Sequence, residues 1–429
     1  MSRTGKLELL GVYLETGHSS VRVGDLARTP EGMMQFVVDE SYIALGQDRP
    51  VLSSSFLSVN DEEKTVQFLR RSTLMQGGRQ LPPWFMNLLP EGALRSLIET
   101  GMPTGKTDDF EMLKWVGADL PGAVVVRSET SEAFSAPVIS APVTGPHIRF
   151  SLAGVQMKMS MLKSDESLTL PAFGMNGNII AKLPSAKIPH LPEVEYTSMM
   201  LARASGVSVP HCELVPVADV HGLPEALLEE GATVLAVDRF DRTPDGMRIH
   251  MEDFNQIMGA VSDRKYTAAN DETIMKIAKI YGGGPGAFLQ AVRRVAVNIM
   301  MGNSDAHLKN WALWYPEPSR GELTPAYDIV AYTVYDHSDE MALRFRNTRN
   351  SALMDAQRFQ RAAEFAGVRP ARVVRELKDT VEEAADTWKG LLQDLPMPDR
   401  YARYLIERTQ RLALTESFGV NFDKTIYVP

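Results

Sequence analysis

A polar stretch between two apolar segments is the feature that most constrains this chain. Residues 300–313 read MMGNSDAHLKNWAL and hold Asp305 and Asn310, with a His and a Lys between them. Before this stretch, apolar residues recur at three- and four-residue intervals across 285–300, which predicts a helix. After it, WALWYP predicts a short strand that ends at Pro316. Polar residues at such a helix-to-strand junction form either an ordinary turn or an active site.

Length and composition set the class of protein. The chain has 429 residues, 44% of them hydrophobic and 23% charged, which predicts a globular protein of two or three compact units. No apolar run reaches the ~20 residues that cross a bilayer. The N-terminus also lacks the cleavage site of a signal peptide, so we expect no membrane association and a cytoplasmic location. The single cysteine, Cys212, excludes internal disulfides and predicts a buried strand thiol.

The pattern of residues changes along the chain. The first ~75 residues alternate apolar and polar positions between turn residues, which predicts a small β-rich unit followed by two helices. A segment rich in Ser, Ala and Pro then predicts a linker. Strands with one inserted helix follow, and the rest of the chain is mainly helical. We therefore predict a two-lobed α+β fold divided into residues 1–127, 128–147, 148–248 and 249–429.

Several polar residues follow one another in the order found in protein kinases. Asp305 and Asn310 have the spacing of the kinase catalytic Asp, which accepts the proton of the attacking hydroxyl, and of the Asn that binds Mg²⁺. Asp328 is a second candidate for holding Mg²⁺. Upstream, Lys182 on a predicted strand and Glu195 on the next helix have the order of the kinase lysine and its ion-pair partner. Phosphoryl transfer requires such an arrangement, because its catalysis consists of positioning and charge neutralisation.

Each of these parts alone has an ordinary explanation. Asn and Asp commonly satisfy the backbone of turns. The turn SLAGVQMK, which suits covering phosphates, has one glycine where the usual phosphate-binding pattern has three. The chain also lacks the kinase segments HRD, DFG and APE. The order of the parts favours a kinase more than any single part does.

Six ordered segments together resemble the HipA family, the kinase toxins of bacterial HipA–HipB toxin–antitoxin pairs. They read SLAGVQMK, AKLP, EYTSMMLARASGV, VDRFDR, GNSDAHLKN and TPAYDI. PPWFMNLLPEG, nearer the N-terminus, resembles the N-terminal subdomain of this family. The resemblance covers nearly the whole chain. It implies a two-lobed, protein-kinase-like fold with a β-rich N-terminal subdomain and a largely helical C-terminal lobe.

The resemblance also assigns roles to site residues. It implies that Asp305 is the catalytic residue and that Asn310 and Asp328 are Mg²⁺ ligands. It makes Lys182, paired with Glu195, the phosphate-binding lysine. The other implied nucleotide contacts lie in the phosphate loop, the segment that meets adenine, the catalytic loop and the position before Asp328: Ala153, Gly154, Val155, Gln156, Met157, Lys158, Asp238, Arg239, Phe240, His307, Leu308, Lys309 and Tyr327.

Cofactors, partners and regulation follow from the same resemblance. It implies an ATP- and Mg²⁺-dependent serine/threonine-protein kinase that phosphorylates itself on Ser151. It implies a HipB-like helix-turn-helix antitoxin that binds operator DNA and represses the operon together with this chain. The implied substrate is a protein, with an aminoacyl-tRNA synthetase as the leading candidate, so that phosphorylation inhibits translation.

Two other functions stay open from the sequence. A loop that begins with Asp also resembles lipid kinases, so a lipid or small-molecule kinase is one alternative. A degenerate kinase fold that serves as a transcriptional corepressor is the other, although the intact polar residues argue against degeneracy. The net charge of −9 argues against strong DNA binding by this chain alone. The N-terminal subdomain carries no catalytic segment, and it either docks the antitoxin or stiffens the ATP-binding lobe.

Overall fold

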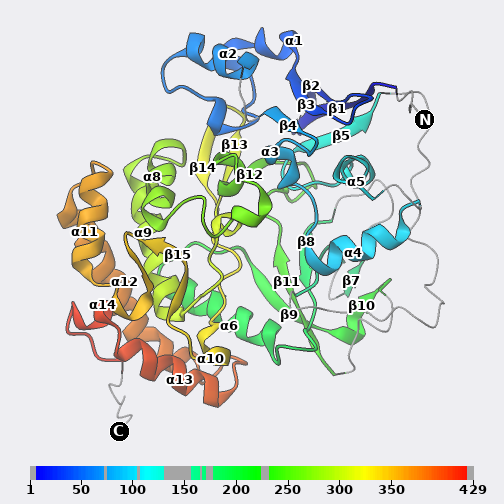
Figure 1. Cartoon of the computed structure of the whole chain (residues 1–429). Helices are drawn as coiled ribbons and strands as arrows, with labels where there is room; N and C mark the ends of the chain where they lie inside the picture. Colours follow the sequence, from blue (N-terminus) through cyan, green and yellow to red (C-terminus); the bar gives the residue numbers. More distant parts are fainter. Residues whose placement is uncertain are drawn as a thin grey trace.

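The computed structural model shows a mixed α+β protein with two β-rich units and a large helical unit (Figure 1). This confirms the predicted fold class. The structure describes residues 6–71, 75–103, 107–129, 156–164, 167–170, 177–223 and 231–422. Ser151, Ala153, Gly154, Val155 and most of the predicted linker lie outside these residues. No helix in the described part of the chain is both long enough and apolar enough to cross a bilayer.

The N-terminal unit is a five-stranded antiparallel sheet with helices packed on it. The first two strands form a hairpin, and Gly17 in its turn has a φ of +57°, which glycine adopts at little cost. The strand order is β4-β3-β2-β1-β5, with bounds β1 Glu8–Thr16, β2 Ser19–Arg28, β3 Met34–Val38, β4 Gln76–Gly78 and β5 Val124–Ser128. The helices are α1 Glu40–Ile43, α2 Glu62–Arg71, α3 Pro83–Met86, α4 Gly92–Gly101 and α5 Asp109–Val116. The small β-rich unit and the two helices predicted after it are confirmed.

A six-stranded sheet forms the second β-rich unit, and it is buried on both faces. In β11, Leu235 and Val237 face the large core shared with α6, whereas Val234 and Ala236 face a smaller core on the other side. Leu97 of α4 packs against this smaller core, so the N-terminal unit covers part of the sheet. The order is β10-β7-β6-β8-β11-β9, with bounds β6 Lys158–Ser164, β7 Ser167–Thr169, β8 Ile179–Lys182, α6 Leu191–Ala204, β9 Cys212–Pro216, β10 Val220–His221 and β11 Thr233–Asp238. Cys212 is buried in β9, as predicted.

The remainder of the chain is mainly helical, as predicted, but it also contains five short strands. Its helices are α7 Phe254–Ile257, α8 Asp271–Tyr281, α9 Pro285–Met301, α10 Thr333–Asp336, α11 Ala356–Phe365, α12 Pro370–Leu391, α13 Asp399–Gln410 and α14 Ala413–Glu416. Its strands are β12 His250–Asp253, β13 Ala312–Glu317, β14 Arg320–Leu323, β15 Glu340–Phe345 and β16 Thr348–Asn350. The end predicted for β13 at Pro316 is one residue short. Pro316 lies beyond the residues of β13 that pair with β12, and the pairing of β13 with β14 is irregular at this point. The N–H that proline lacks is therefore not needed for a hydrogen bond between these strands.

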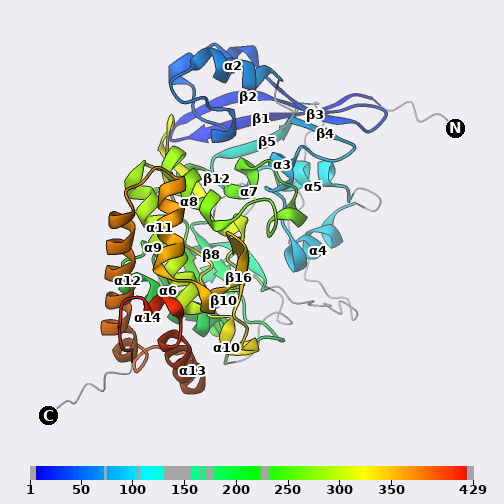
Figure 2. The same cartoon turned by 60° about the vertical axis from the view of Figure 1, so that its left-hand side comes forward.

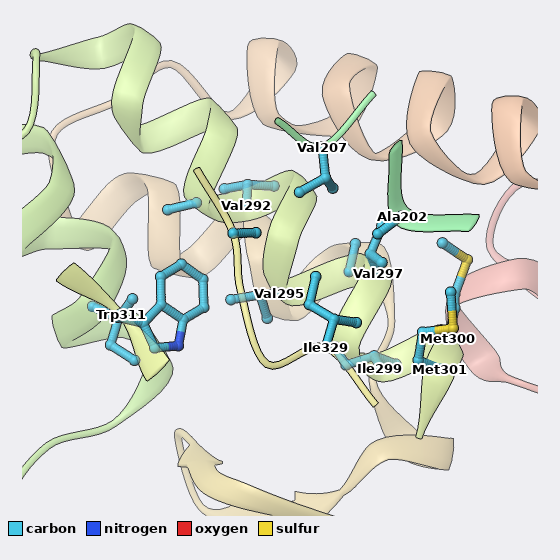
Figure 3. Packing of buried hydrophobic residues seen from close by; sticks show 14 of the residues in the cluster. Ala202, Val207, Val292, Val295, Val297, Ile299, Met300, Met301, Trp311 and Ile329 are labelled. Carbon is cyan, nitrogen blue, oxygen red and sulfur yellow. The ribbon is translucent and has the colours of Figure 1, made fainter. Parts of the chain in front are cut away.

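Helix α9 lies at the centre of the helical unit and leads directly into the polar stretch. Gly302 ends it with a φ of +61°, and a Cβ there would lie 2.5 Å from the Thr333 side chain. Glycine is therefore required both for the turn and for the close approach. Figure 3 shows Trp311 and Ile329 packed among buried residues of α9. Because these two residues directly follow Asn310 and Asp328, one core anchors both polar segments.

A buried carboxylate joins the N-terminal unit to the strands that follow the six-stranded sheet. Glu252 in β12 is completely buried and accepts hydrogen bonds from the Ser54 backbone N–H at 2.7 Å and from its hydroxyl at 2.8 Å. Trp84 Nε1 donates to it at 3.1 Å and the Tyr315 hydroxyl at 2.6 Å. Such contacts favour a scaffold role for the N-terminal unit, whose sheet Figure 2 shows above the rest of the molecule.

Replacing Glu252 with Leu is expected to lower the free energy of unfolding by about 3 kcal/mol or more, because buried donors lose their charged acceptor. Glu252→Gln keeps an oxygen for Ser54 and Tyr315 but presents an NH₂ group to Trp84, so we expect a smaller loss. Urea unfolding of the wild type, Glu252→Gln and Glu252→Leu measures the order of their stabilities. Equal stability of the wild type and Glu252→Leu would contradict this role of the carboxylate.

Candidate active site

A cavity of about 360 Å³ lies between the six-stranded sheet, helix α6 and the polar stretch. Its charged and polar lining comes from six separate segments of the chain. These residues are Gln156, Lys158, Lys182, Glu195, Tyr266, Ser304, Asp305, Asn310 and Asp328. Ile188, Leu191, Val330 and Tyr332 complete the wall.

Two lysines and two carboxylates form a cluster on the sheet side of the cavity. Lys158 and Lys182 lie directly opposite each other on β6 and β8, so their like charges need nearby anions. Both ammonium groups contact Asp328, and Lys182 also contacts Glu195 of α6. Burial alone would raise the pKa of Asp328, but the two lysines hold it well below its usual value. Asp328 is therefore ionised at neutral pH.

Asp305 is held in the cavity wall by hydrogen bonds from three directions. Its Oδ1 accepts from the Tyr266 hydroxyl at 2.6 Å, and its backbone carbonyl accepts from Asn310 Nδ2 at 2.7 Å. Its backbone N–H donates to Asn303 Oδ1 at 3.1 Å. Asn303 Nδ2 in turn donates to the Asp328 carbonyl at 3.2 Å. Asn303 thereby ties the two carboxylate-bearing segments together.

Buried Arg294 of α9 holds the backbone of the polar stretch in place. Its guanidinium donates to the Asn310 carbonyl at 2.8 Å and lies over the Trp311 ring at 4.3 Å and the Tyr327 ring at 5.6 Å. Tyr327 donates from its hydroxyl to the Lys309 carbonyl at 3.0 Å. These contacts fix the backbone that carries Asn310 and the residue before Asp328. Asp328 itself has a φ of +55°, a left-handed conformation that this packing stabilises.

The cavity has the ligand types that Mg²⁺ and a triphosphate require. Asn310 donates a hydrogen bond from Nδ2 to the Asp305 carbonyl, so its Oδ1 is available as a metal ligand. The Asp328 carboxylate is a second candidate oxygen ligand. Among the described residues, no group of three or more His, Cys, Asp and Glu residues could hold a metal ion. Mg²⁺ often binds through one or two protein oxygens plus phosphates, so this pair suits it. Gln156 Nε2 is buried without a hydrogen-bond partner in the described structure and is a candidate donor to phosphate.

Other residues that the sequence assigned to nucleotide binding lie outside this cavity lining. Leu308 is completely buried in the large core and Met157 is buried in the smaller core, so neither side chain faces the cavity. The Lys309 ammonium contacts Glu91 of the N-terminal unit instead. Buried His307 packs against the ring of Tyr266 at 5.1 Å, and desolvation lowers its pKa to about 4.

The segment predicted to meet adenine also lies outside the lining. Arg239 is held in a buried ion pair with Asp241 at 2.7 Å, which occupies its guanidinium. Asp238 is exposed at the end of β11. Phe240 stacks near Tyr327, with ring centroids 5.7 Å apart. The Arg239 and Phe240 side chains thus contact Asp241 and Tyr327, and the sequence pattern does not predict these contacts.

Residues 150–388 match the model described as HipA-like C-terminal domain, and residues 13–127 match HipA N-terminal domain. The chain is 35% identical over 407 residues to a putative kinase, Y4dM, of Sinorhizobium fredii, covering 92% of this chain and 96% of that protein. It is 27% identical over 300 residues to the serine/threonine-protein kinase toxin HipA of Shewanella oneidensis, covering 61% and 65% of the two chains.

A solved structure gives the same architecture. It is the complex of Shewanella oneidensis HipA and HipB with operator DNA, which matches with a TM-score of 0.68 and 20% identity. The match covers 95% of this chain and 100% of that chain. At this level of identity the match shows the fold.

Proposed function

The chain belongs to the HipA family of kinase toxins, and from this premise we propose that it is an ATP-dependent serine/threonine-protein kinase that acts as the toxin of a toxin–antitoxin pair. The observation that carries the proposal is the convergence of Lys182, Asp305, Asn310 and Asp328 on one cavity. Lys182 comes from β8, and the other three residues come from two loops much later in the sequence. Their chemistry is that of phosphoryl transfer.

Each residue has a defined task in this reaction. Asp305 accepts the proton of a serine or threonine hydroxyl while the hydroxyl oxygen forms a bond to the γ-phosphorus and the bond to ADP breaks. Lys182 and Lys158 supply positive charge toward the phosphates. Asn310 and Asp328 would hold Mg²⁺, which neutralises charge on the phosphate oxygens. Glu195 keeps Lys182 pointed into the cavity through their buried ion pair.

We expect Tyr266 to position the catalytic carboxylate. Tyr266→Phe removes the hydroxyl that donates to Asp305 at 2.6 Å but keeps the ring beside His307. We expect kcat to fall about tenfold, equivalent to ~1.4 kcal/mol, with an unchanged KM for ATP. Tyr13→Phe is the matched control, because it removes a phenol–carboxylate hydrogen bond of 2.7 Å in the N-terminal unit. Equal kcat values for both variants would show that Tyr266 has no part in positioning Asp305.

Self-inhibition through Ser151 is a further part of the proposal. The family resemblance supports it, since Ser151 aligns with an autophosphorylated serine. A phosphate adds roughly −1.5 to −2 charge beside the loop that has to cover a negative triphosphate, so loss of ATP binding should follow. Phosphopeptide mapping after incubation with ATP tests this step. Phosphate found only at other positions would contradict it.

A HipB-like antitoxin and operator DNA are the proposed partners. The Shewanella oneidensis structure contains HipA, HipB and operator DNA, and the fold is shared. A net charge of −9 makes this chain a poor DNA ligand alone, so the antitoxin should supply the base-reading contacts. A gel-shift titration with kinase alone, antitoxin alone and both should show tight binding only with the antitoxin. Tight, sequence-specific binding by the kinase alone would contradict this division of roles.

The substrate is proposed to be an aminoacyl-tRNA synthetase, whose phosphorylation would slow translation. This rests on the family resemblance. Incubating the purified kinase with a cell lysate and ATP labelled at the γ-phosphate identifies its targets, with Asp305→Asn as the control for other kinases in the lysate. Labelled proteins without a synthetase would exclude this substrate. Label in lipids or small molecules would favour the alternative kinase class.

A further inference from the structure

Glu91, at the start of helix α4, sends its carboxylate out of the N-terminal unit. It occupies the N-cap position of α4 but accepts no hydrogen bond from the first turn of that helix. Its Oε1 instead accepts from Lys309 Nζ at 2.6 Å, and its Oε2 accepts from Lys265 Nζ at 3.1 Å. The Ser262 hydroxyl also donates to it. Glu91 of the N-terminal unit thus makes no N-cap hydrogen bond within its own helix. It contacts two loops of the helical unit instead.

Both loops touch the catalytic machinery described above. Lys309 lies in the catalytic loop, directly before Asn310. Lys265 directly precedes Tyr266, whose hydroxyl donates to Asp305. The two loops are also joined to each other, because the Leu308 backbone N–H donates to the Lys265 carbonyl at 3.2 Å.

The turn that carries Glu91 is itself firmly held. Asn87 Nδ2 donates to the Ala260 carbonyl at 2.8 Å, and Asn255 Nδ2 donates to Asn87 Oδ1 at 2.9 Å. The Asn87 carbonyl accepts a second hydrogen bond from Lys309 Nζ at 3.3 Å. The turn is therefore anchored just before Glu91, through Asn87, to residues 255–260 and to Lys309.

Charge makes Glu91 necessary to this arrangement. Two lysine ammonium groups that meet at one place repel each other unless an anion separates them. Burial alone would raise the pKa of Glu91, but Lys309, the Ser262 hydroxyl and Lys265 lower it to about 2. The carboxylate is therefore ionised at every pH at which the protein would work.

We propose that Glu91 is a positioning residue for phosphoryl transfer, through which the N-terminal unit fixes the catalytic loop against the segment that carries Tyr266. The inference rests on the proposed kinase function and adds a role for the N-terminal unit beyond antitoxin docking. Glu91 touches neither the cavity lining nor the reacting atoms. It acts through Lys309 and Lys265.

Kinetics of the full-length protein test this inference. Glu91→Gln keeps the shape of the side chain but removes its charge, and we expect kcat to fall about 10²-fold with an unchanged KM for ATP, because small misplacements of catalytic groups cost about that much. Glu62→Gln is the matched control. Glu62 is also on the N-terminal unit, is similarly exposed and pairs with Arg49 at 2.9 Å, away from the cavity. It should lose no activity.

Two further variants separate positioning from general loss of stability. Lys309→Met should lower kcat like Glu91→Gln, and the double variant should lose little more, because both changes remove the Glu91–Lys309 ion pair. Lys309→Arg keeps a positive charge for Glu91 and should lose less activity than Lys309→Met. Equal kcat in Glu91→Gln and Glu62→Gln, or fully additive losses in the double variant, would overturn the inference.

Hydrogen exchange does not depend on catalysis, so it tests the role of Glu91 separately from the proposed kinase activity. Hydrogen exchange of the backbone amides of residues 303–311 should be faster in Glu91→Gln than in the wild type and unchanged in Glu62→Gln. A wild-type protein that transfers no phosphate would refute the kinase function, while the exchange data would still decide whether Glu91 holds the loop. Unchanged exchange in Glu91→Gln would refute the role of Glu91.

Discussion

Replacing Asp305 with Asn is expected to slow phosphoryl transfer about 10³-fold, because an amide cannot accept the proton of the attacking hydroxyl. The fold should be unaffected. Asn has nearly the same shape, and its side-chain oxygen can still accept the hydrogen bond from Tyr266. Single-turnover transfer from γ-labelled ATP measures the effect.

Asp305→Asn should also bind ATP as the wild type does, since Lys158, Lys182 and Asp328 are unchanged. Calorimetric titration of both proteins with ATP and Mg²⁺ checks this control. A purified Asp305→Asn protein with near-wild-type transfer would remove Asp305 from the reaction. Loss of ATP binding together with activity would assign it to nucleotide binding.

Asp328→Asn is expected to lower the transfer rate at least about 10²-fold for a different reason. The change removes a charged candidate ligand of Mg²⁺ and the anion shared by Lys158 and Lys182. The affinity of the wild type for ATP should rise with Mg²⁺ concentration, whereas that of Asp328→Asn should respond weakly. Asp305→Asn is the matched control, because it should keep the full response to Mg²⁺.

The same variant tests which residue holds the metal. A full response to Mg²⁺ in Asp328→Asn would place the metal on other ligands. Asn310→Ala should then be examined, since its Oδ1 is the other available oxygen donor. Retained transfer in both variants would exclude this pair as the metal site.

Local sequence patterns predicted the elements on which the site is built. The spacing of apolar residues predicted helix α9, and the change to polar residues after it marked the stretch that we propose as the catalytic loop. The short apolar run around Lys182 predicted β8. These features depend on neighbours in the sequence, so they can be read without the fold.

The direction of loop side chains could not be read in this way. The family resemblance assigned Lys309 to nucleotide binding, but its ammonium contacts Glu91, which is 218 positions away in the sequence. Tyr266 reaches Asp305 from a loop whose sequence carries no motif. Arg294 stands out in the sequence as a charged residue within the apolar helix α9, and the structure shows that it is buried. Contacts between distant segments decide all three.

Strand β13 was predicted, but the other four short strands after residue 248 were missed for a related reason. Segments such as RGEL and TRN have too few residues to show an alternating pattern. They form strands because β12, β13 and β14 pair with one another, and because β15 pairs with β16. Tertiary context outweighs local propensity at these positions.

Transfer of phosphate from ATP to protein hydroxyls tests the central claim most directly. The purified wild type, incubated with γ-labelled ATP, Mg²⁺ and a cell lysate, should produce phosphoserine or phosphothreonine that is absent when Asp305→Asn replaces it. Equal labelling with the wild type and Asp305→Asn, or no labelled protein at all, would contradict a kinase built on this cavity.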